Sequence, residues 1–88
     1  MATGTIRYWA AARAATGGVG EEPYDARTLA EALAAARARH GEALGRVLDR
    51  CSYVVDASPV GGRAHDSVAL SDGGTVEVLP PFAGGAPT

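Results

Sequence analysis

The stretch VEVLPPFAGG, residues 76–85, predicts a β-strand that leaves the body of the protein and continues into a thin tail. Its valines alternate with a glutamate and a leucine, and the two prolines that follow lack the amide hydrogens needed to extend a strand ladder. Gly84 and Gly85 have no Cβ atoms and fit where other residues would clash. We therefore expect the tail to enter a narrow site on another protein.

The composition indicates one small domain with few side chains that could act as nucleophiles or metal ligands. Ten acidic residues against eight basic ones give a net charge of −2, which argues against a nucleic-acid partner. All the basic residues are arginines, so no side-chain amine is available for Schiff-base chemistry or for an isopeptide bond. Cys51 is the only cysteine, which excludes an internal disulfide and a metal site built from thiolates. Without a long apolar run or a leader pattern, we expect a soluble, cytoplasmic protein that has no membrane contact.

The first third of the chain predicts two strands around a short helix. Residues 5–9 alternate and are rich in β-prone types, which puts Ile6 and Tyr8 on one face of a strand. The Ala-rich residues 10–15 predict a short helix, and residues 21–24 predict a second strand. Pro23 would confine that strand to a sheet edge.

The main helix is expected from Thr28 to His40. Thr28 and Glu31 have the spacing of a capping box, and Gly41 is a typical helix stop. Its apolar stripe at i, i+3, i+4 and i+7 consists of Leu29, Ala32, Leu33 and Ala36. A further helical turn is expected around Leu44, Val47 and Leu48.

The remaining segments predict a strand at residues 51–56, a turn at 58–62, a short apolar patch at 68–70 and the final strand at 75–79. One long helix with four or five strands favours an α+β β-grasp fold, in which a mixed sheet packs on the helix. The first and last strands then lie side by side, and Val54, Val76 and Val78 join the core. We expect this domain to span residues 1–82, followed by a tail at 83–88.

Three stretches resemble the MoaD/ThiS family of ubiquitin-like sulfur carriers, and most of all its MoaD branch. They are YWAAAR at residues 8–13, TLAEAL at 28–33 with RHG at 39–41, and LSDGGTVEVLPPFAGG at 70–85. Three departures from the family pattern stand out. Gly74-Thr75 replaces an acidic pair that usually follows the turn glycine, Asp56 stands where an asparagine is common, and three residues follow Gly85.

The resemblance implies a carrier without catalysis of its own, free of bound cofactor or metal. An E1-like adenylyltransferase would use ATP to activate the Gly85 carboxylate, which becomes a thiocarboxylate. The thiocarboxylate would donate sulfur to the large subunit of a synthase such as molybdopterin synthase, or to another acceptor enzyme, in molybdopterin, thiamin, cysteine or related biosynthesis. A zinc peptidase of the JAMM type would first cut between Gly85 and Ala86 and remove Ala86-Pro87-Thr88. The implied binding residues are Pro80, Pro81, Phe82, Ala83 and Gly84.

Two other functions remain open on the sequence alone, a modifier that forms amide bonds to target lysines and a β-grasp adaptor that is never activated. Some of the remaining residues also have simpler interpretations. We expect Cys51 to be a buried apolar residue, His40 to interact with its helix end, and Trp9 to serve packing or a partner surface. The pair His65-Asp66 has no third partner or nucleophile and does not indicate catalysis.

Overall fold

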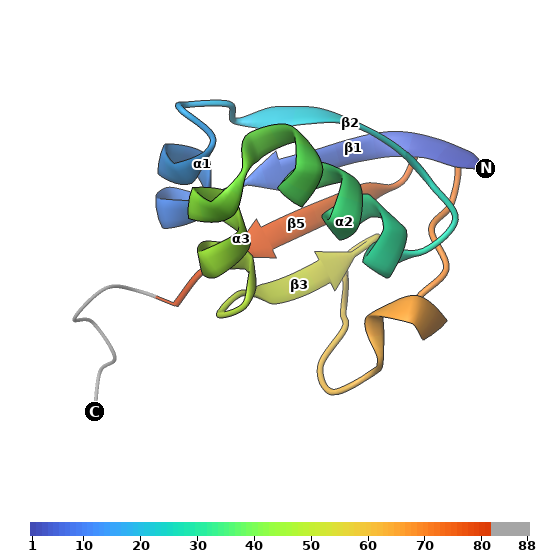
Figure 1. Cartoon of the computed structure of the whole chain (residues 1–88). Coiled ribbons are helices and arrows are strands. Elements are labelled where there is room, and N and C mark those ends of the chain that lie inside the picture. The colour runs from blue at the N-terminus through green and yellow to red at the C-terminus, as the bar shows by residue number, and fades with distance from the viewer. Residues whose placement is uncertain (82–88) are drawn as a thin grey trace.

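The computed structural model describes residues 1–81, which form a β-sheet with helices packed on it (Figure 1). Phe82 and residues 83–88, including the expected tail, lie outside the described residues. The elements follow in chain order: β1 (Ala2–Tyr8), α1 (Ala10–Ala15), β2 (Glu21–Ala26), α2 (Leu29–His40), α3 (Glu42–Leu48), β3 (Ser52–Val55), β4 (Ser58–Pro59), a short 3₁₀-helix (His65–Ser67) and β5 (Thr75–Leu79).

The five strands form one mixed sheet in the order β2-β1-β5-β3-β4. The first and last strands are neighbours at its centre and run parallel, in register from Thr5 opposite Thr75 to Tyr8 opposite Val78. The other pairings are antiparallel. This topology confirms the predicted β-grasp fold, and β2 lies at the edge as Pro23 required.

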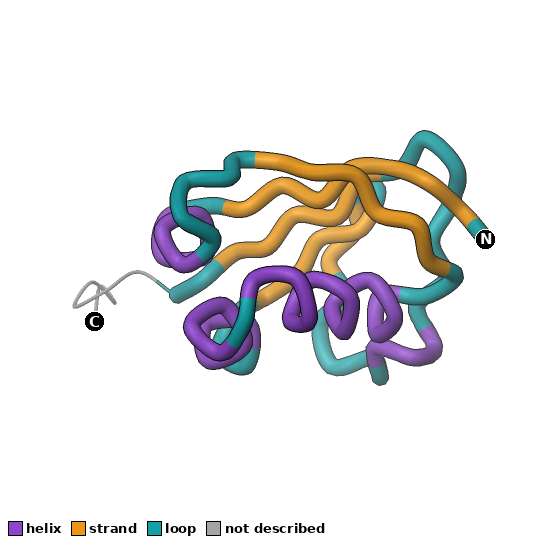
Figure 2. The backbone as a smooth tube through the Cα atoms, turned by 45° about the horizontal axis from the view of Figure 1, so that its top comes forward, coloured by secondary structure: helices purple, strands orange, loops and turns teal. Residues whose placement is uncertain are grey.

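The helices α2 and α3 cover one face of the sheet, and α1 lies at the end toward which β5 runs (Figures 1 and 2). The predicted stripe of α2 is buried in full, at Leu29, Ala32, Leu33 and Ala36, and Ile6, Tyr8, Val76 and Val78 meet it from the central strands. The cap of α2 is partly as predicted. The Thr28 hydroxyl accepts from the Glu31 amide at 3.2 Å, as predicted. The Glu31 carboxylate accepts from the amide of Arg27, whereas a capping box would use the amide of Thr28.

The prediction that Val54 belongs to the core is wrong. Directly opposite residues of an antiparallel pair share a face, and β3 pairs Tyr53 with Val78 but Val54 with Glu77. Tyr53 is therefore buried, and Val54 is only half-buried on the face away from the helices. A run of apolar residues cannot fix which alternate positions face inward.

Several predicted boundaries also change. The first strand begins earlier and ends before Trp9, which is extended and precedes α1. The predicted turn at residues 58–62 includes the two-residue strand β4 and the buried Val60. The helical turn expected around residue 44 is the seven-residue helix α3, in which Leu44 and Leu48 are buried.

Asp56, one of the departures from the family pattern, holds the turn after β3 to the start of β5. It has a φ of 50° in the left-handed region, which aspartate tolerates better than most residues. Its carboxylate accepts from the Thr75 amide at 2.9 Å and from the Ser71 hydroxyl at 2.7 Å. An aspartate here therefore gives two hydrogen bonds that fix the far end of the sheet.

Candidate functional site

The end of the sheet from which β5 leaves is the candidate functional site. Strand β5 ends at Leu79, Pro80 is half-buried and Pro81 is exposed. The other predicted site residues, Phe82, Ala83, Gly84, Gly85 and Ala86, lie outside the described residues. The parallel pairing with β1 places Trp9 beside the end of β5, where its amide donates to the Val78 carbonyl at 3.3 Å.

Among residues 1–81, Trp9 is the exposed aromatic residue beside this exit, and 42% of its surface is accessible. Its indole Nε1–H donates to a Glu77 carboxylate oxygen at 3.2 Å, and the Arg7 guanidinium lies over the ring, 5.1 Å from its centroid. Arg7 and Glu77 stand opposite each other in neighbouring strands. These contacts hold a large aromatic surface in one orientation at low entropic cost, which suits a protein contact better than core packing.

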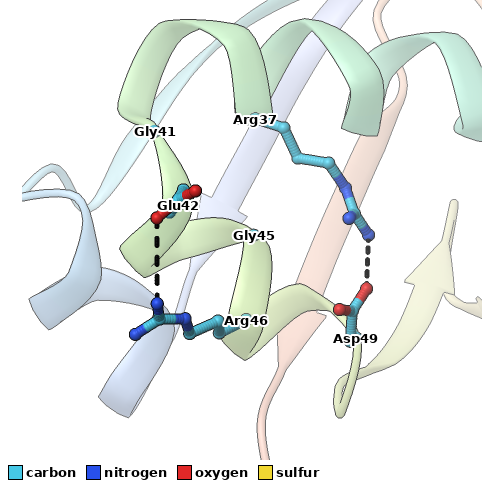
Figure 3. A pocket seen from close by; sticks show the side chains of 6 residues that line it. All are labelled: Arg37, Gly41, Glu42, Gly45, Arg46 and Asp49. Carbon is cyan, nitrogen blue, oxygen red and sulfur yellow. Dashed lines mark hydrogen bonds and ion pairs between the residues drawn. The ribbon is translucent and has the colours of Figure 1, made fainter.

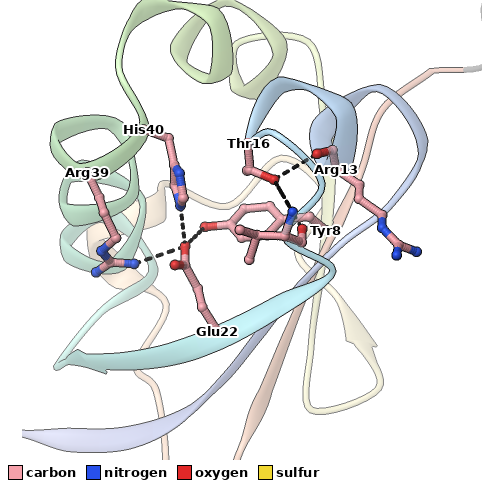
Figure 4. Close-up of polar contacts among 7 residues, drawn as sticks. Tyr8, Arg13, Thr16, Glu22, Arg39 and His40 are labelled. Carbon is pink, nitrogen blue, oxygen red and sulfur yellow. Dashed lines mark hydrogen bonds and ion pairs between the residues drawn. The ribbon is translucent and has the colours of Figure 1, made fainter.

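A second polar group links β1, β2 and the end of α2 (Figure 4). One carboxylate oxygen of Glu22 accepts from the Tyr8 hydroxyl at 2.5 Å and from the Arg39 guanidinium at 2.9 Å, and His40 Nε2 lies 2.8 Å from the same oxygen. We call these four residues the Glu22 cluster. His40 therefore binds a carboxylate and also contacts the Tyr8 ring edge-on, in addition to standing at its helix end.

The Glu22 cluster is a structural clamp. Burial alone would raise the pKa of the Glu22 carboxyl, but the three hydrogen bonds outweigh burial and hold that pKa below its ordinary value of 4.5. Burial and the bond to Glu22 raise the pKa of Tyr8 above its ordinary value. At neutral pH the Glu22 carboxylate is thus charged and the Tyr8 phenol is protonated. The phenol can therefore donate a charge-assisted hydrogen bond to the carboxylate.

Sequence reasoning missed the role of Glu22, although a signal was present. Glu22 lies two residues before the buried Tyr24, so both share the inward face of β2. An acidic residue on an inward face requires a partner. Only the fold shows that the partners come from β1 and from the last turn of α2.

A shallow depression of about 410 Å³ lies between α2 and α3, and Figure 3 shows the side chains that line it. Arg37 reaches Asp49 at 2.9 Å, and Arg46 reaches Glu42 at 3.7 Å. Each cation is already paired with a carboxylate of the same depression. The depression therefore offers no unpaired charge to a ligand.

Neither Cys51 nor His65 contacts the partners that a catalytic group would need within residues 1–81. Cys51 is half-buried and its thiol donates to the Val47 carbonyl at 3.1 Å, while burial raises its pKa to about 11, so it is an unreactive thiol at neutral pH. His65 packs edge-on against Tyr53, with ring centroids 5.0 Å apart. Within residues 1–81, no three histidine, cysteine or acidic side chains are grouped as a metal site would require. None of the helices in this part of the chain combines the length and apolar character needed to span a membrane.

The comparisons with known proteins agree with this geometry. The model of the ThiS family matches residues 6–85, so the matched region includes Gly84 and Gly85 and ends three residues before Thr88. By sequence, none of the curated proteins matches the chain.

Solved structures give the same fold over nearly the whole chain. The small archaeal modifier protein 1 of Methanosarcina acetivorans is 19% identical with a TM-score of 0.81, over 97% of this chain and 98% of the other. CysO of Amycolatopsis orientalis, solved in a complex with BexX, is 23% identical with a TM-score of 0.76, over 92% of this chain and 98% of the other. A chain in the complex of subunits 1 and 2 of the molybdopterin-converting factor of Helicobacter pylori is 20% identical with a TM-score of 0.66, over 94% of this chain and 99% of the other.

Proposed function

Because the chain belongs to the ThiS family of small ubiquitin-like carriers and modifiers, we propose that it is a cytoplasmic sulfur carrier whose active group is the carboxylate of Gly85. The observation that carries this proposal is the family match through Gly85, on a fold in which β5 leads directly out of one end of the sheet. Two relatives of the same fold were solved in complexes with a second protein, which supports a function that depends on partners.

The proposed chemistry takes place on partner enzymes. A Gly85 carboxylate oxygen attacks the α-phosphate of ATP on an E1-like adenylyltransferase, and pyrophosphate leaves. Hydrosulfide, or an equivalent sulfide-level nucleophile supplied by the partner system, then attacks the acyl carbon; AMP leaves and a thiocarboxylate forms. The thiocarboxylate donates sulfur to the large subunit of a synthase such as molybdopterin synthase, or to another biosynthetic enzyme. The carrier contributes reach and shape, because two residues without side chains extend by roughly 7 Å at minimal width.

The proline pair supports this role. Pro80 and Pro81 restrict the backbone where the chain leaves the sheet, which lowers the entropy lost when the tail docks. Phe82 follows them and is the proposed apolar anchor in the partner. We expect Phe82→Ala to weaken binding to the adenylyltransferase and to leave the melting temperature nearly unchanged. A lower melting temperature with unchanged binding would instead assign Phe82 to the core.

The chain that retains Ala86-Pro87-Thr88 is proposed to be a precursor. The Gly85 carbonyl belongs to an amide, so it has no carboxylate oxygen that could attack ATP. Hydrolysis of the bond between Gly85 and Ala86, by a zinc peptidase of the JAMM type, would create the required terminus, since a zinc-bound water can attack an extended peptide carbonyl.

Mass spectrometry tests the proposal directly. A chain that ends at Gly85 should form an acyl-adenylate with ATP and the cognate adenylyltransferase, and should gain about 16 Da when one oxygen is replaced by sulfur. The full-length chain should react only after the peptidase is added. Thiocarboxylate on a chain that retains Ala86-Pro87-Thr88 would refute the precursor step.

The same experiment separates the other functions. Adducts to lysines of target proteins would identify a modifier, and a trimmed chain that remains inert with every adenylyltransferase of its genome would identify an adaptor.

A further inference from the structure

A small charged depression lies beside the exit of β5, between the end of β1, helix α1 and the start of β2. It encloses about 160 Å³ and is lined by Arg7, Tyr8, Trp9, Arg13, Gly20 and Glu21. Its lining includes the guanidinium groups of Arg7 and Arg13 and the carboxylate of Glu21. The Glu77 carboxylate, which accepts from the Trp9 indole, stands opposite Arg7 in the neighbouring strand, so both carboxylates lie on the Arg7 side. We call it the Arg13 corner.

Arg13 supplies the uncompensated charge. Arg7 pairs with Glu21 at 3.6 Å, whereas Arg13 forms no ion pair with any carboxylate of residues 1–81. Figure 4 shows the Arg13 side chain extending away from the Glu22 cluster. An unpaired guanidinium beside an aromatic ring presents a fork of donors that matches a carboxylate.

The backbone around Arg13 is fixed by local contacts. The Thr16 hydroxyl donates to the Arg13 carbonyl at 2.7 Å and accepts from the Val19 amide at 2.9 Å, which ties the end of α1 to the turn that follows (Figure 4). A Cβ placed on Gly20 would lie 3.6 Å from Arg13 Cζ, so the guanidinium rests over the glycine backbone. The Arg13 backbone is therefore fixed, and its exposed side chain extends past Gly20.

We propose that the Arg13 corner receives an acidic side chain from the enzyme that takes up the tail, which makes Arg13 a docking residue. This inference rests on the proposed function, because that function supplies the enzyme. A single unpaired guanidinium, with two carboxylates nearby, suits the single charge of an aspartate or glutamate better than a multiply charged phosphate. The corner adjoins the end of β5, so a protein that encloses the tail would also reach it.

Paired variants of the trimmed chain ending at Gly85 test the proposal. Arg13→Gln removes the charge of the corner, and Arg27→Gln is a matched control, since Arg27 is also without an ion pair in residues 1–81 but lies at the opposite end of the sheet. Binding to the cognate E1-like adenylyltransferase is measured by calorimetry at about 50 mM and about 500 mM salt, with the melting temperature of each variant as a folding control.

We expect Arg13→Gln to bind roughly three- to fivefold more weakly at low salt, as for a partly exposed charge pair, and the difference to shrink at high salt. Arg27→Gln should bind like the unmodified chain. Equal binding by Arg13→Gln and the unmodified trimmed chain would overturn the inference and leave the proposed function standing. If the unmodified trimmed chain neither binds nor is adenylated, the proposed function fails and the inference fails with it.

A titration with inorganic phosphate alone separates a protein carboxylate from a small free anion. Trp9 is the only tryptophan of the chain and lines the corner, so its fluorescence reports on occupancy. We expect no saturable change up to about 10 mM phosphate, because a single surplus charge binds a free anion weakly in water. A saturable change at submillimolar phosphate would overturn the assignment to a protein side chain.

Discussion

Replacing Glu22 by glutamine should destabilise the domain far more than the same change at its neighbour Glu21. The Glu22 side chain is 12% exposed and accepts three hydrogen bonds on one oxygen, whereas Glu21 is 64% exposed and pairs only with Arg7, at 3.6 Å. Both residues belong to β2, so the two variants differ in environment and share their chemistry.

The magnitude follows from the type of bond. Hydrogen bonds to a charged group contribute about 1.5–3 kcal/mol and neutral ones about 0.5–1.5 kcal/mol. Glutamine keeps a carbonyl oxygen but loses the charge, so each of the three bonds weakens by about 1 kcal/mol, and relief of the cost of burying the charge offsets part of the sum. We expect a loss of about 2 kcal/mol, which lowers the melting temperature by roughly 10 °C in a domain of this size. Glu21→Gln should change stability by less than about 0.5 kcal/mol.

The stabilising effect of Glu22 should fall as the pH is lowered. The pKa of Glu22 is held below 4.5 in the folded protein, so its stabilising effect is present above the pKa of the unfolded chain and is lost as the pH falls through the folded value. The stability difference between the unmodified protein and Glu22→Gln should therefore shrink as the pH falls below about 4.5, where the Glu22 carboxylate becomes protonated.

Urea unfolding followed by circular dichroism from pH 3 to pH 8 measures this difference. A Glu22→Gln loss below about 0.5 kcal/mol at pH 7 would show that the cluster does not act as a clamp. A loss that stays the same down to pH 3 would show that the carboxylate charge has no part in it.

Three further predictions test the core, the close approach of strands and the thiol. Leu33→Ala should cost about 2–5 kcal/mol in urea unfolding, because Leu33 lies on the buried face of α2, and a loss below about 0.5 kcal/mol would contradict its place in the core. Gly4→Ala should cost about 1–3 kcal/mol, because a Cβ there would overlap the Tyr24 ring, whereas Gly20→Ala should be nearly neutral; equal melting temperatures would contradict this. Cys51, with its pKa near 11, should react with iodoacetamide at pH 8 roughly a hundredfold more slowly than a free thiol, and a comparable rate would show that the thiol is accessible and ionised.

The fold class could be predicted from the sequence because its signals are local. The apolar stripe of α2, its cap at Thr28 and its stop at Gly41 depend on residues within one or two helical turns. The alternation in residues 76–79 and the prolines after it define the last strand and its exit in the same way. Compact packing of these elements then leaves few arrangements, and the central parallel pair of β1 and β5 is the expected one.

The register of the strands and the partners of the polar side chains depended on tertiary contacts. Val54 and Tyr53 are equally apolar neighbours, and only the pairing with β5 shows that Tyr53 faces inward. The Glu22 cluster joins residues that are 14 and 18 positions apart, and the Arg13 corner joins β1, α1 and β2. Local propensity carries no information about which distant side chain completes a hydrogen bond or leaves a charge unpaired, because that depends on how elements pack after the chain has folded. The sequence therefore determined the scaffold and the strand that ends at the two prolines, and the tertiary structure decided which polar side chains surround the end of β5.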